Sequence, residues 1–340
     1  MRPEAAPEKP GICYAETDDG ETLPVVDITN PAFTVTTTDD ELGSLTRLFI
    51  DESKRFVGMP WIVRRIMMRA FLRSSKLGRG LLAASGTYLT GLNTYRLKLG
   101  PDNLGAGAVA ADYRIASSVA AISTRLRLED MARLLAEGLT PALLATPDRP
   151  LLFVNIAGGP AADSFNAVIL LSRDRRIALT GRQIVIAVLD LDKGGPAFGA
   201  RAVNVLTRPG GPLSGIEIEF RHLPYDWRKT SALEPRLAEL DATHAICGIS
   251  SEGGLFEYGS DDEISANLAA LHAGAPAGAV VAGSVTRDDE PARIAQAAGH
   301  AATRLRTLPA FQALASGAGW TEDRAIARPF SYNVRLVKSR

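Results

Sequence analysis

Five apolar runs alternate with helical stretches between residues 151 and 286, and this alternation restricts the possible folds more than any other feature of the chain. An uninterrupted apolar run is typical of a strand in a sheet that helices cover on both faces. Strands that alternate with helices pair in parallel. The pattern therefore predicts a parallel α/β sheet built from "LLFVNIA", "QIVIAVLDLD", "GIEIEFRHL", "HAICGISS" and "GAVVAGSVT".

The end of the chain departs from this alternation. A helical stretch over residues 290–319 is followed by "RAIARPFSYNVRLVKSR", residues 324–340, which has the pattern of two strands around a short connection with a proline. Two strands joined by so short a connection pair antiparallel. We therefore expect a hairpin to close the parallel sheet.

The first 145 residues differ from the rest of the chain. Residues 1–40 are rich in Pro, Thr and Asp, which predicts a loosely held N-terminal arm. Residues 41–145 place apolar side chains three and four positions apart, which predicts an all-helical domain that serves as a cap or a dimerisation unit. The turn-forming sequence "TPDRP" marks the boundary with an α/β domain at residues 146–340.

Charge and composition exclude several classes of partner. The 38 basic and 38 acidic side chains cancel, so we expect no nucleic-acid partner and no attraction to an anionic membrane. We find no apolar stretch of signal-sequence or membrane-spanning type. The two cysteines, Cys13 and Cys247, have neither disulfide nor metal-ligand spacing. We therefore expect a cytoplasmic protein without a metal site.

One stretch joins a predicted strand to a predicted helix through two glycines. In "NIAGGPAADSFNAVILL", residues 155–171, the chain turns at Gly158 and Gly159, and Pro160 suits the first position of the helix. Such a turn lets a ligand approach the backbone, and the helix N-terminus offers free N–H groups. A tight turn without a ligand is the alternative.

Acidic residues follow the next two predicted strands. Asp190 and Asp192 end the second strand, where the two oxygens of a carboxylate match the vicinal hydroxyls of a ribose, and by strand alternation they point the same way. Asp226 follows the third strand and suits an exocyclic adenine amine, with Tyr225 or Trp227 stacked on the base. Solvated loop acids are the alternative, but the order of these features suggests an adenosyl ligand.

From about residue 151 to its end, the chain resembles the class I S-adenosylmethionine-dependent methyltransferases. The first motif of that family, acid-x-Gly-x-Gly-x-Gly, aligns with Asn155, Ala157, Gly159 and Ala161, so one of the three glycines is kept. The resemblance implies a Rossmann-like, mostly parallel sheet of seven strands with a C-terminal antiparallel hairpin. It also implies S-adenosylmethionine as the cofactor, bound at the glycine turn and by the strand-end acids.

The segment after the fourth predicted strand, "SSEGGLFEYGSDDEISANLAALHAG", lies where this family places residues that face the reacting methyl group. We expect Ser250 and Ser251 to contact the cofactor. Glu252, Glu257 and Tyr258 are the candidate catalytic residues. Glu252 would be a general base or an ammonium ligand, and Glu257 belongs to the same acidic cluster. Tyr258 would lie against the sulfonium or hydrogen-bond the substrate. The acids in "SDDE" have a simpler role, because they suit the first turn of a capped helix.

The helical part contains a further candidate segment, "SGTYLTGLNTYRLKLGPDNLG", residues 85–105. Tyr88 and Tyr95 are seven residues apart and would share one face of a helix. With Arg96 they are candidate substrate contacts, and plain helix packing is the alternative. The basic stretch "RRIMMRAFLRSSK", residues 64–76, predicts a solvated helix face rather than a nucleic-acid or membrane contact.

These features favour methyl transfer from S-adenosylmethionine to a small molecule, with the helical domain as a cap or as the contact in a homodimer. The acidic cluster favours an acceptor that carries an amine. Methyl transfer is an in-line displacement that needs alignment and exclusion of water more than a base. Two other functions stay open: an NAD(P)-dependent oxidoreductase, because a glycine turn and an acid also serve dinucleotides, and a non-catalytic binding or assembly protein of the same fold.

Overall fold

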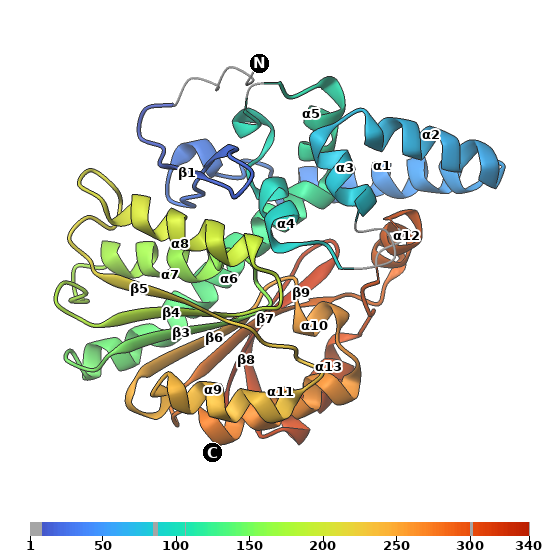
Figure 1. Ribbon diagram of the computed structural model, residues 1–340. Coiled ribbons are helices and arrows are strands. Elements are labelled where there is room, and N and C mark those ends of the chain that lie inside the picture. The colour runs from blue at the N-terminus through green and yellow to red at the C-terminus, as the bar shows by residue number, and fades with distance from the viewer. Residues whose placement is uncertain (1–8, 84–87, 106, 300–301, 340) are drawn as a thin grey trace.

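The computed structural model of the chain describes residues 9–83, 88–105, 107–299 and 302–339. Its centre is a sheet with helices on both faces, and a group of N-terminal helices lies beyond one edge of that sheet (Figure 1). Residues 1–8, 84–87, 106, 300–301 and 340 lie outside the described residues, and they include parts of the predicted arm, the predicted helical domain, the helical stretch 290–319 and the C-terminal hairpin. Within the described ranges, no helix combines the length and the apolar character needed to cross a membrane.

The central sheet has seven strands in the order β5-β4-β3-β6-β7-β9-β8. The strands are β3 (Leu151–Ile156), β4 (Ile184–Leu189), β5 (Ile218–Leu223), β6 (Ile246–Ser251), β7 (Val280–Thr286), β8 (Trp320–Ala327) and β9 (Ser331–Lys338). The first five pair in parallel. β9 runs antiparallel to both β7 and β8. The predicted α/β class, the seven strands and the closing hairpin are therefore confirmed.

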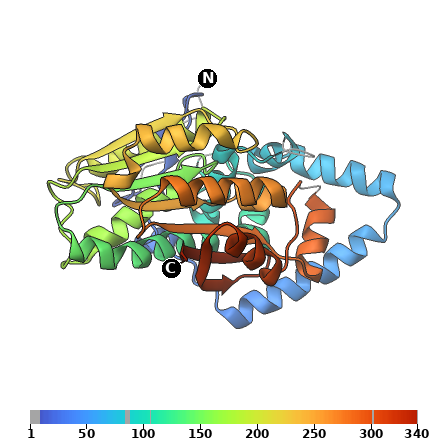
Figure 2. The same ribbon diagram turned by 90° about the horizontal axis from the view of Figure 1, so that it is seen from below.

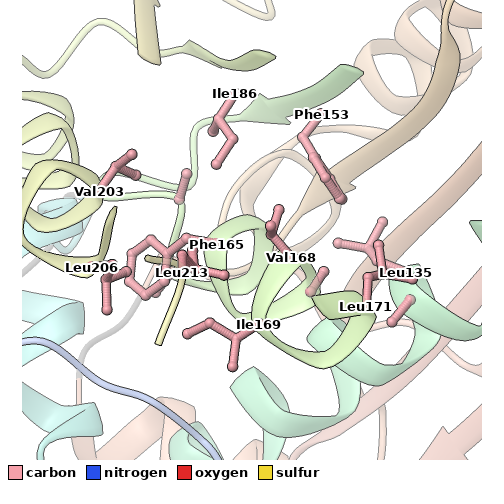
Figure 3. Packing of buried hydrophobic residues seen from close by; sticks show 14 of the residues in the cluster. Leu135, Phe153, Phe165, Val168, Ile169, Leu171, Ile186, Val203, Leu206 and Leu213 are labelled. Atoms are coloured by element: carbon pink, nitrogen blue, oxygen red, sulfur yellow. The ribbon is translucent and has the colours of Figure 1, made fainter. Parts of the chain in front are cut away.

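Alternate residues of the central strand β3 belong to different cores, one on each face of the sheet. Phe153 packs with Leu135 and Val168 on the first face (Figure 3). Val154 belongs to the second. The first face carries α6 (Val119–Ala145), α7 (Ala162–Arg173) and α8 (Gly194–Thr207). The second carries α9 (Leu233–Glu239), α11 (Asp261–Gly274) and α13 (Leu308–Gly317). Burial on both faces explains why β3 is apolar without alternation.

The remaining elements are not part of the central sheet or of the six helices that cover it. They are β1 (Tyr14–Glu16), β2 (Thr22–Pro24), α1 (Asp39–Val57), α2 (Trp61–Arg73), α3 (Lys76–Ala83), α4 (Gly91–Lys98), α5 (Ala110–Ala116), α10 (Leu255–Tyr258), α12 (Glu290–Gly299) and the 3₁₀ turns Pro31–Phe33, Pro101–Asn103, Thr230–Ala232 and Ala242–His244. The single helix predicted over 290–319 is wrong, because two helices, α12 and α13, occupy that range.

The helix α6 connects the helical residues to the sheet. Its side chains Leu128, Met131 and Leu139 are buried in the same core as Leu151 of β3. The boundary predicted at residue 146 therefore does not separate two hydrophobic cores. Residues 119–145 form one of the layers that cover the sheet.

A buried acid on α6 fastens this helix to the C-terminal hairpin. Asp130 is 3% exposed and accepts hydrogen bonds from Arg328 Nε and Nη2 and from Asn333 Nδ2, each at 2.7 Å. Arg328 lies in the turn between β8 and β9, and Asn333 lies in β9. Asp130 is therefore a single point at which α6, β9 and the turn before it are joined.

We predict that Asp130→Ala lowers the free energy of unfolding by about 3 kcal/mol, because it leaves Arg328 and the Asn333 amide without their acceptor. Urea unfolding followed by circular dichroism measures the change. Glu129→Ala is the control, since Glu129 forms a more exposed i,i+4 pair with Arg133, and such pairs contribute less than about 1 kcal/mol. Equal effects of the two substitutions would contradict this role of Asp130.

Candidate functional site

The carboxyl ends of β3, β4 and β6 meet where the strand order changes direction. β4 lies on one side of β3 and β6 on the other. In open α/β sheets, ligands bind outside the carboxyl ends of the strands at such a switch point. The sequence-predicted cofactor residues that lie at these strand ends are Asn155, Ala157, Gly158, Gly159, Asp190, Asp192, Ser250 and Ser251.

The backbone of the glycine turn is in an unusual conformation. Ala157, Gly159 and Ala161 have φ angles of +54°, +59° and +56°. Only glycine adopts this region without strain, so each alanine costs about 1–2 kcal/mol. The helix α7 begins at Ala162. Pro160 therefore lies in the turn and does not occupy the predicted first helical position.

The two strand-end acids bind backbone N–H groups instead of pointing freely to one side. Asp190 Oδ2 accepts from Gly159 N at 3.1 Å, and its Oδ1 accepts from Asp192 N at 2.9 Å. The Asp192 carboxylate accepts from Gly194 N and Gly195 N at the start of α8. Burial raises the pKa of Asp190. The two acids therefore lie at the turn, as the ribose assignment requires, but they have separate partners.

The glycine turn is covered by the chain itself. A Cβ built on Gly91, the first residue of α4, would lie 2.4 Å from Gly159 Cα. A Cβ on Gly195 of α8 would lie 2.8 Å from the same atom. Three backbones without side chains therefore meet at Gly159. Two surface cavities of the described residues lie elsewhere, one along α6 and α7 and one among α3, α4 and α5.

A group of buried polar side chains lies beneath the turn. Asn155 Nδ2 donates to Asp163 Oδ1 at 2.7 Å and to Ser250 Oγ at 2.9 Å. Asn155 is fully buried in β3. Ser250 is its partner residue on β6, the strand that pairs with β3. Within the described residues, Asn155 Oδ1, Asp163 Oδ2 and Ser251 Oγ are buried without a hydrogen-bond partner. Such unsatisfied atoms are uncommon and mark a site that merits an explanation.

Two acids at the end of β6 are paired with cations from the helical residues. Lys98 Nζ of α4 lies 2.5 Å from Glu252 Oε2, and Arg127 Nε of α6 lies 3.0 Å from Glu252 Oε1. Arg127 Nη1 also lies 2.6 Å from Glu257, which accepts a further hydrogen bond from Ser284. These pairs join α4 and α6 to the carboxyl edge of the sheet.

This pairing counts against the predicted catalytic roles of Glu252 and Glu257, because both carboxylates already have cationic partners within the chain. Burial pushes the pKa of Glu252 upward, but Lys98 and Arg127 outweigh it and hold the pKa below its ordinary value. A general base needs a free lone pair and a pKa near the working pH. The ammonium that Glu252 was expected to bind is supplied by Lys98 of the same chain.

Three aromatic side chains gather at the same edge. The ring of Tyr88 lies edge-on to Trp227 and to Tyr258, with centroid distances of 5.5 and 5.0 Å. Burial and the nearby Glu257 raise the pKa of Tyr258 to about 12. The structure thus brings Tyr88 and Tyr258, predicted from distant segments, together with Trp227, the alternative stacking residue.

Two residues predicted at the adenine do not have the expected arrangement. Tyr225 is buried and its hydroxyl donates to Asn267 Oδ1 at 2.5 Å, so its ring is not available for stacking. Asp226 forms an ion pair with Arg228 at 2.8 Å, and this arginine lowers its pKa. An adenine amine at Asp226 would have to compete with Arg228 for the carboxylate.

Two of the three predicted substrate contacts hold the N-terminal arm. Tyr95 is fully buried, and its hydroxyl donates to Pro24 O at 2.9 Å and accepts from Val26 N at 2.8 Å. Arg96 pairs with Glu21 at 2.6 Å. The shared helix face of Tyr88 and Tyr95 is also wrong, because α4 begins only at Gly91.

Four residues of this site are absent from the residues predicted from the sequence: Gly91, Lys98, Arg127 and Asp163. One of them carried a signal, because Asp163 is an acid in the first turn of the helix after the glycine turn. The other three belong to helices whose position on the sheet is set by tertiary contacts. Their spacing in the sequence gives no indication that they meet Gly159 and the acids after β6.

The side chains at this edge match parts of an adenosyl ligand, but the backbone does not leave the turn open. Asp190 and Asp192 are acceptors suited to a diol, and the aromatic group offers faces for a base. Gly91 lies against Gly159, so the turn is covered on the side of α4. A ligand that contacts Gly159 from this side therefore requires the first residues of α4 to move away from the turn.

We predict that Asp163 makes stability depend on pH. Burial, and then Glu252, raise the pKa of Asp163 to about 6, so the folded state binds this proton more tightly than the unfolded state. The free energy of unfolding therefore falls as the pH rises from about 4, the pKa in the unfolded chain, to about 6, the pKa in the folded chain. Above about pH 6, Asp163 causes no further change. Relative to Asp163→Asn, the wild type should lose about 2–3 kcal/mol between pH 4.5 and 7.5.

Chemical denaturation of both proteins across this range measures the difference. Asp174→Asn is the control, because Arg176 lowers the pKa of Asp174 to about 2 and its titration lies outside the range. A difference between wild type and Asp163→Asn that does not change with pH would contradict the raised pKa.

No protein-family model matches the chain, and no curated protein sequence does either. Among solved structures, a possible exported protein from Bordetella parapertussis is 18% identical, with 88% of this chain and 97% of that chain covered and a TM-score of 0.58. Magnesium protoporphyrin IX methyltransferase from Synechocystis PCC 6803 with bound SAM is 12% identical, with 74% and 92% covered and a TM-score of 0.45. Human N-acetylserotonin methyltransferase in complex with SAM is 13% identical, with 65% and 55% covered and a TM-score of 0.38.

At 18% identity the first of these likenesses concerns the fold alone, and the other two, with TM-scores below 0.5, add nothing to it. The topology rests on the strands themselves. Five parallel strands change direction at β3 and end in an antiparallel hairpin whose last strand lies inside the sheet. The chain therefore has the class I methyltransferase fold that the sequence resemblance implied.

Proposed function

We propose that this protein transfers a methyl group from S-adenosylmethionine to a small-molecule acceptor. The observation that carries the proposal is the 3.1 Å hydrogen bond from Gly159 N to Asp190 Oδ2. It joins the glycine turn after one strand to the acid after the neighbouring strand, at the switch point of the sheet. An adenosyl ligand binds at this position in open α/β sheets. When bound, S-adenosylmethionine would supply an electrophilic methyl group.

In this proposal, the side chains of the edge divide into two groups. Asp190 and Asp192 would hold the ribose hydroxyls, each exchanging a backbone donor for a ligand donor. Tyr88, Trp227 and Tyr258 would provide aromatic faces for the adenine or for the acceptor. Asn155 Oδ1, a buried acceptor without a partner, adjoins the turn because a Cβ on Gly158 would lie 1.9 Å from it.

The reaction would depend on positioning and not on a carboxylate base. Glu252 and Glu257 are held by Lys98 and Arg127. An acceptor with a free lone pair therefore suits this edge better than one that must first lose a proton. Recognition of a positively charged amine by these two acids has lost its support, because Lys98 and Arg127 already neutralise them. The contribution of the protein would be alignment of the acceptor and exclusion of water.

One observation favours a second function, a non-catalytic binding or assembly protein of the same fold. The backbones of Gly91 and Gly159 touch, with a Cβ on either residue only 2.4–2.5 Å from the other's Cα. A turn that is closed by its own chain needs no ligand. No observation of the site favours the NAD(P)-dependent alternative over these two.

Calorimetric titration of the purified chain with S-adenosylmethionine, S-adenosylhomocysteine and NAD(P)H tests the proposal. We expect binding of the first two alone, and loss of binding in the double variant Asp190→Ala with Asp192→Ala. Glu217→Ala with Glu219→Ala is the control. These two acids have the same spacing as Asp190 and Asp192, but they are exposed and lie away from the glycine turn. Binding of none of the ligands by the wild type would favour the non-catalytic function, and unchanged affinity in the folded double variant would exclude the ribose assignment.

We predict that Gly91→Ala weakens the closed arrangement of α4 on the glycine turn. The new Cβ would lie 2.4 Å from Gly159 Cα, and such overpacking costs about 1–3 kcal/mol. If the ligand binds only when α4 has moved, the variant should bind S-adenosylhomocysteine at least threefold more tightly than the wild type. It should also unfold at a lower temperature.

Gly43→Ala is the control for this change, because Gly43 lies in α1 and a Cβ there meets no atom closer than 3.7 Å. Titration calorimetry gives the affinity and differential scanning calorimetry the melting temperature. Weaker binding by Gly91→Ala than by the wild type would mean that α4 helps to hold the ligand and does not have to move.

A further inference from the structure

Two N-terminal helices expose an unusual number of apolar side chains. Of the thirteen large hydrophobic residues that are exposed in the described part of the chain, eight lie between residues 48 and 67. Trp61, Ile62 and Ile66 of α2 are 61%, 54% and 63% exposed. Exposed apolar side chains concentrated in one region of a protein surface are typical of an interaction site.

These residues belong to α1, α2 and the short connection between them, which we call the helical hairpin. Figures 1 and 2 show both helices extending beyond the sheet and its covering helices, with their junction at the far end. The base of α1 is fixed, since Leu42 packs against Val119 and Ile122 of α6. By contrast, no residue of α2 is buried.

The exposed face of α2 has a regular arrangement. Ile62, Ile66 and Ala70 follow one another at four-residue spacing and therefore form one stripe along the helix. Arg65 and Arg69 repeat at the same spacing beside this stripe. The stripe spans a little over two turns, and its three side chains are exposed. Short helices are marginal in water without packing, so this face leaves α2 without a contact that would stabilise it. The stripe therefore needs an occupant.

The two helices of the hairpin carry opposite charge. α2 has four arginines and no acid, whereas α1 has five acids and three basic residues. One of those basic residues, Lys54, is already paired with Glu290 at 2.7 Å. In the described part of the chain, Asp51 and Glu52 of α1 and Arg65 and Arg69 of α2 are exposed and form no ion pair within 4 Å. Each helix thus presents the charge that the other would attract.

We propose that the helical hairpin is the contact between two copies of this chain, with α2 of each copy lying against α1 of the other. A two-fold interface repeats every contact, so one copy's Arg65 and Arg69 would face the other's Asp51 and Glu52, twice. Contact of α2 with α2 would instead place arginines against arginines. The apolar stripe of α2 would meet the exposed Leu48 of α1.

An anionic lipid surface is the other occupant that a basic apolar helix could have. The charges of the hairpin favour a second copy, because a lipid surface would attract α2 but repel Asp51 and Glu52 of α1. A second copy of the chain carries both positive and negative side chains, so it can pair with the charges of both helices. The proposal does not depend on the reaction at the strand ends.

Two charge-reversed chains test the proposal. The first carries Arg65→Glu with Arg69→Glu, and the second carries Asp51→Lys with Glu52→Lys. Sedimentation velocity over a hundredfold range of concentration measures the mass, which is 36.2 kDa for one copy. We expect the wild type to form a dimer and each reversed chain to dimerise at least tenfold more weakly.

A one-to-one mixture of the two reversed chains should dimerise as strongly as the wild type. In the mixed dimer, glutamates of one α2 face lysines of one α1, and the native charges meet at the other contact. Restoration in the mixture also shows that both chains are folded. Arg173→Glu with Arg175→Glu is the control, because these exposed arginines lie at the end of α7 and should leave the dimer unchanged.

Three results would overturn the proposal. They are a wild type that stays monomeric at all concentrations, a dimer that neither reversal weakens, and a mixture that does not recover. Cosedimentation with phosphatidylglycerol vesicles and with phosphatidylcholine vesicles completes the test. A monomeric chain that binds only the anionic vesicles, through Arg65 and Arg69, would identify a lipid surface as the occupant.

Discussion

The buried ion pairs at the end of β6 determine how the helical residues lie on the sheet. Lys98 and Arg127 come from two helices, and Glu252 and Glu257 follow one strand. Removing one member of a buried pair leaves a charge without a counterion and costs about 3–5 kcal/mol, whereas an exposed pair contributes less than about 1 kcal/mol. These four side chains therefore fix α4 and α6 against the carboxyl edge more firmly than surface contacts would.

This anchoring has a consequence for the glycine turn. Lys98 is the last residue of α4 and Gly91 is the first, so they are about 10 Å apart along the helix. Lys98 and Tyr95 hold the far end of the helix. At the near end, Leu92 packs on the core of the first face, and Gly91 lies against Gly159. That contact offers van der Waals attraction and no side chain. Exposing Gly159 on this side would therefore require the start of α4, with Leu92, to move away from the core.

Much of the fold could be predicted because β3, β4, β6 and β7 are buried on both faces, which leaves continuous apolar runs in the sequence. The strand-end positions of Gly159 and Asp190 followed from the same runs. The roles of Glu252 and Tyr95 did not, because each depends on a partner far away in the chain: Lys98 is 154 residues from Glu252, and Pro24 is 71 residues from Tyr95. An acid or a tyrosine has the same appearance in a sequence whether it meets a ligand or its own chain.

The sequence by itself determined the parallel sheet, its closing hairpin and the set of strand ends at which chemistry would occur, because local apolar periodicity and turn residues encode these directly. Only the tertiary structure decided which of those side chains are free. Packing of α4 and α6 places two cations on the acids after β6 and one glycine on the turn after β3. Ion pairs and backbone contacts between distant segments do not affect the local apolar periodicity of the sequence. Which acids are paired, and whether the glycine turn is covered, can therefore be known only from the folded chain.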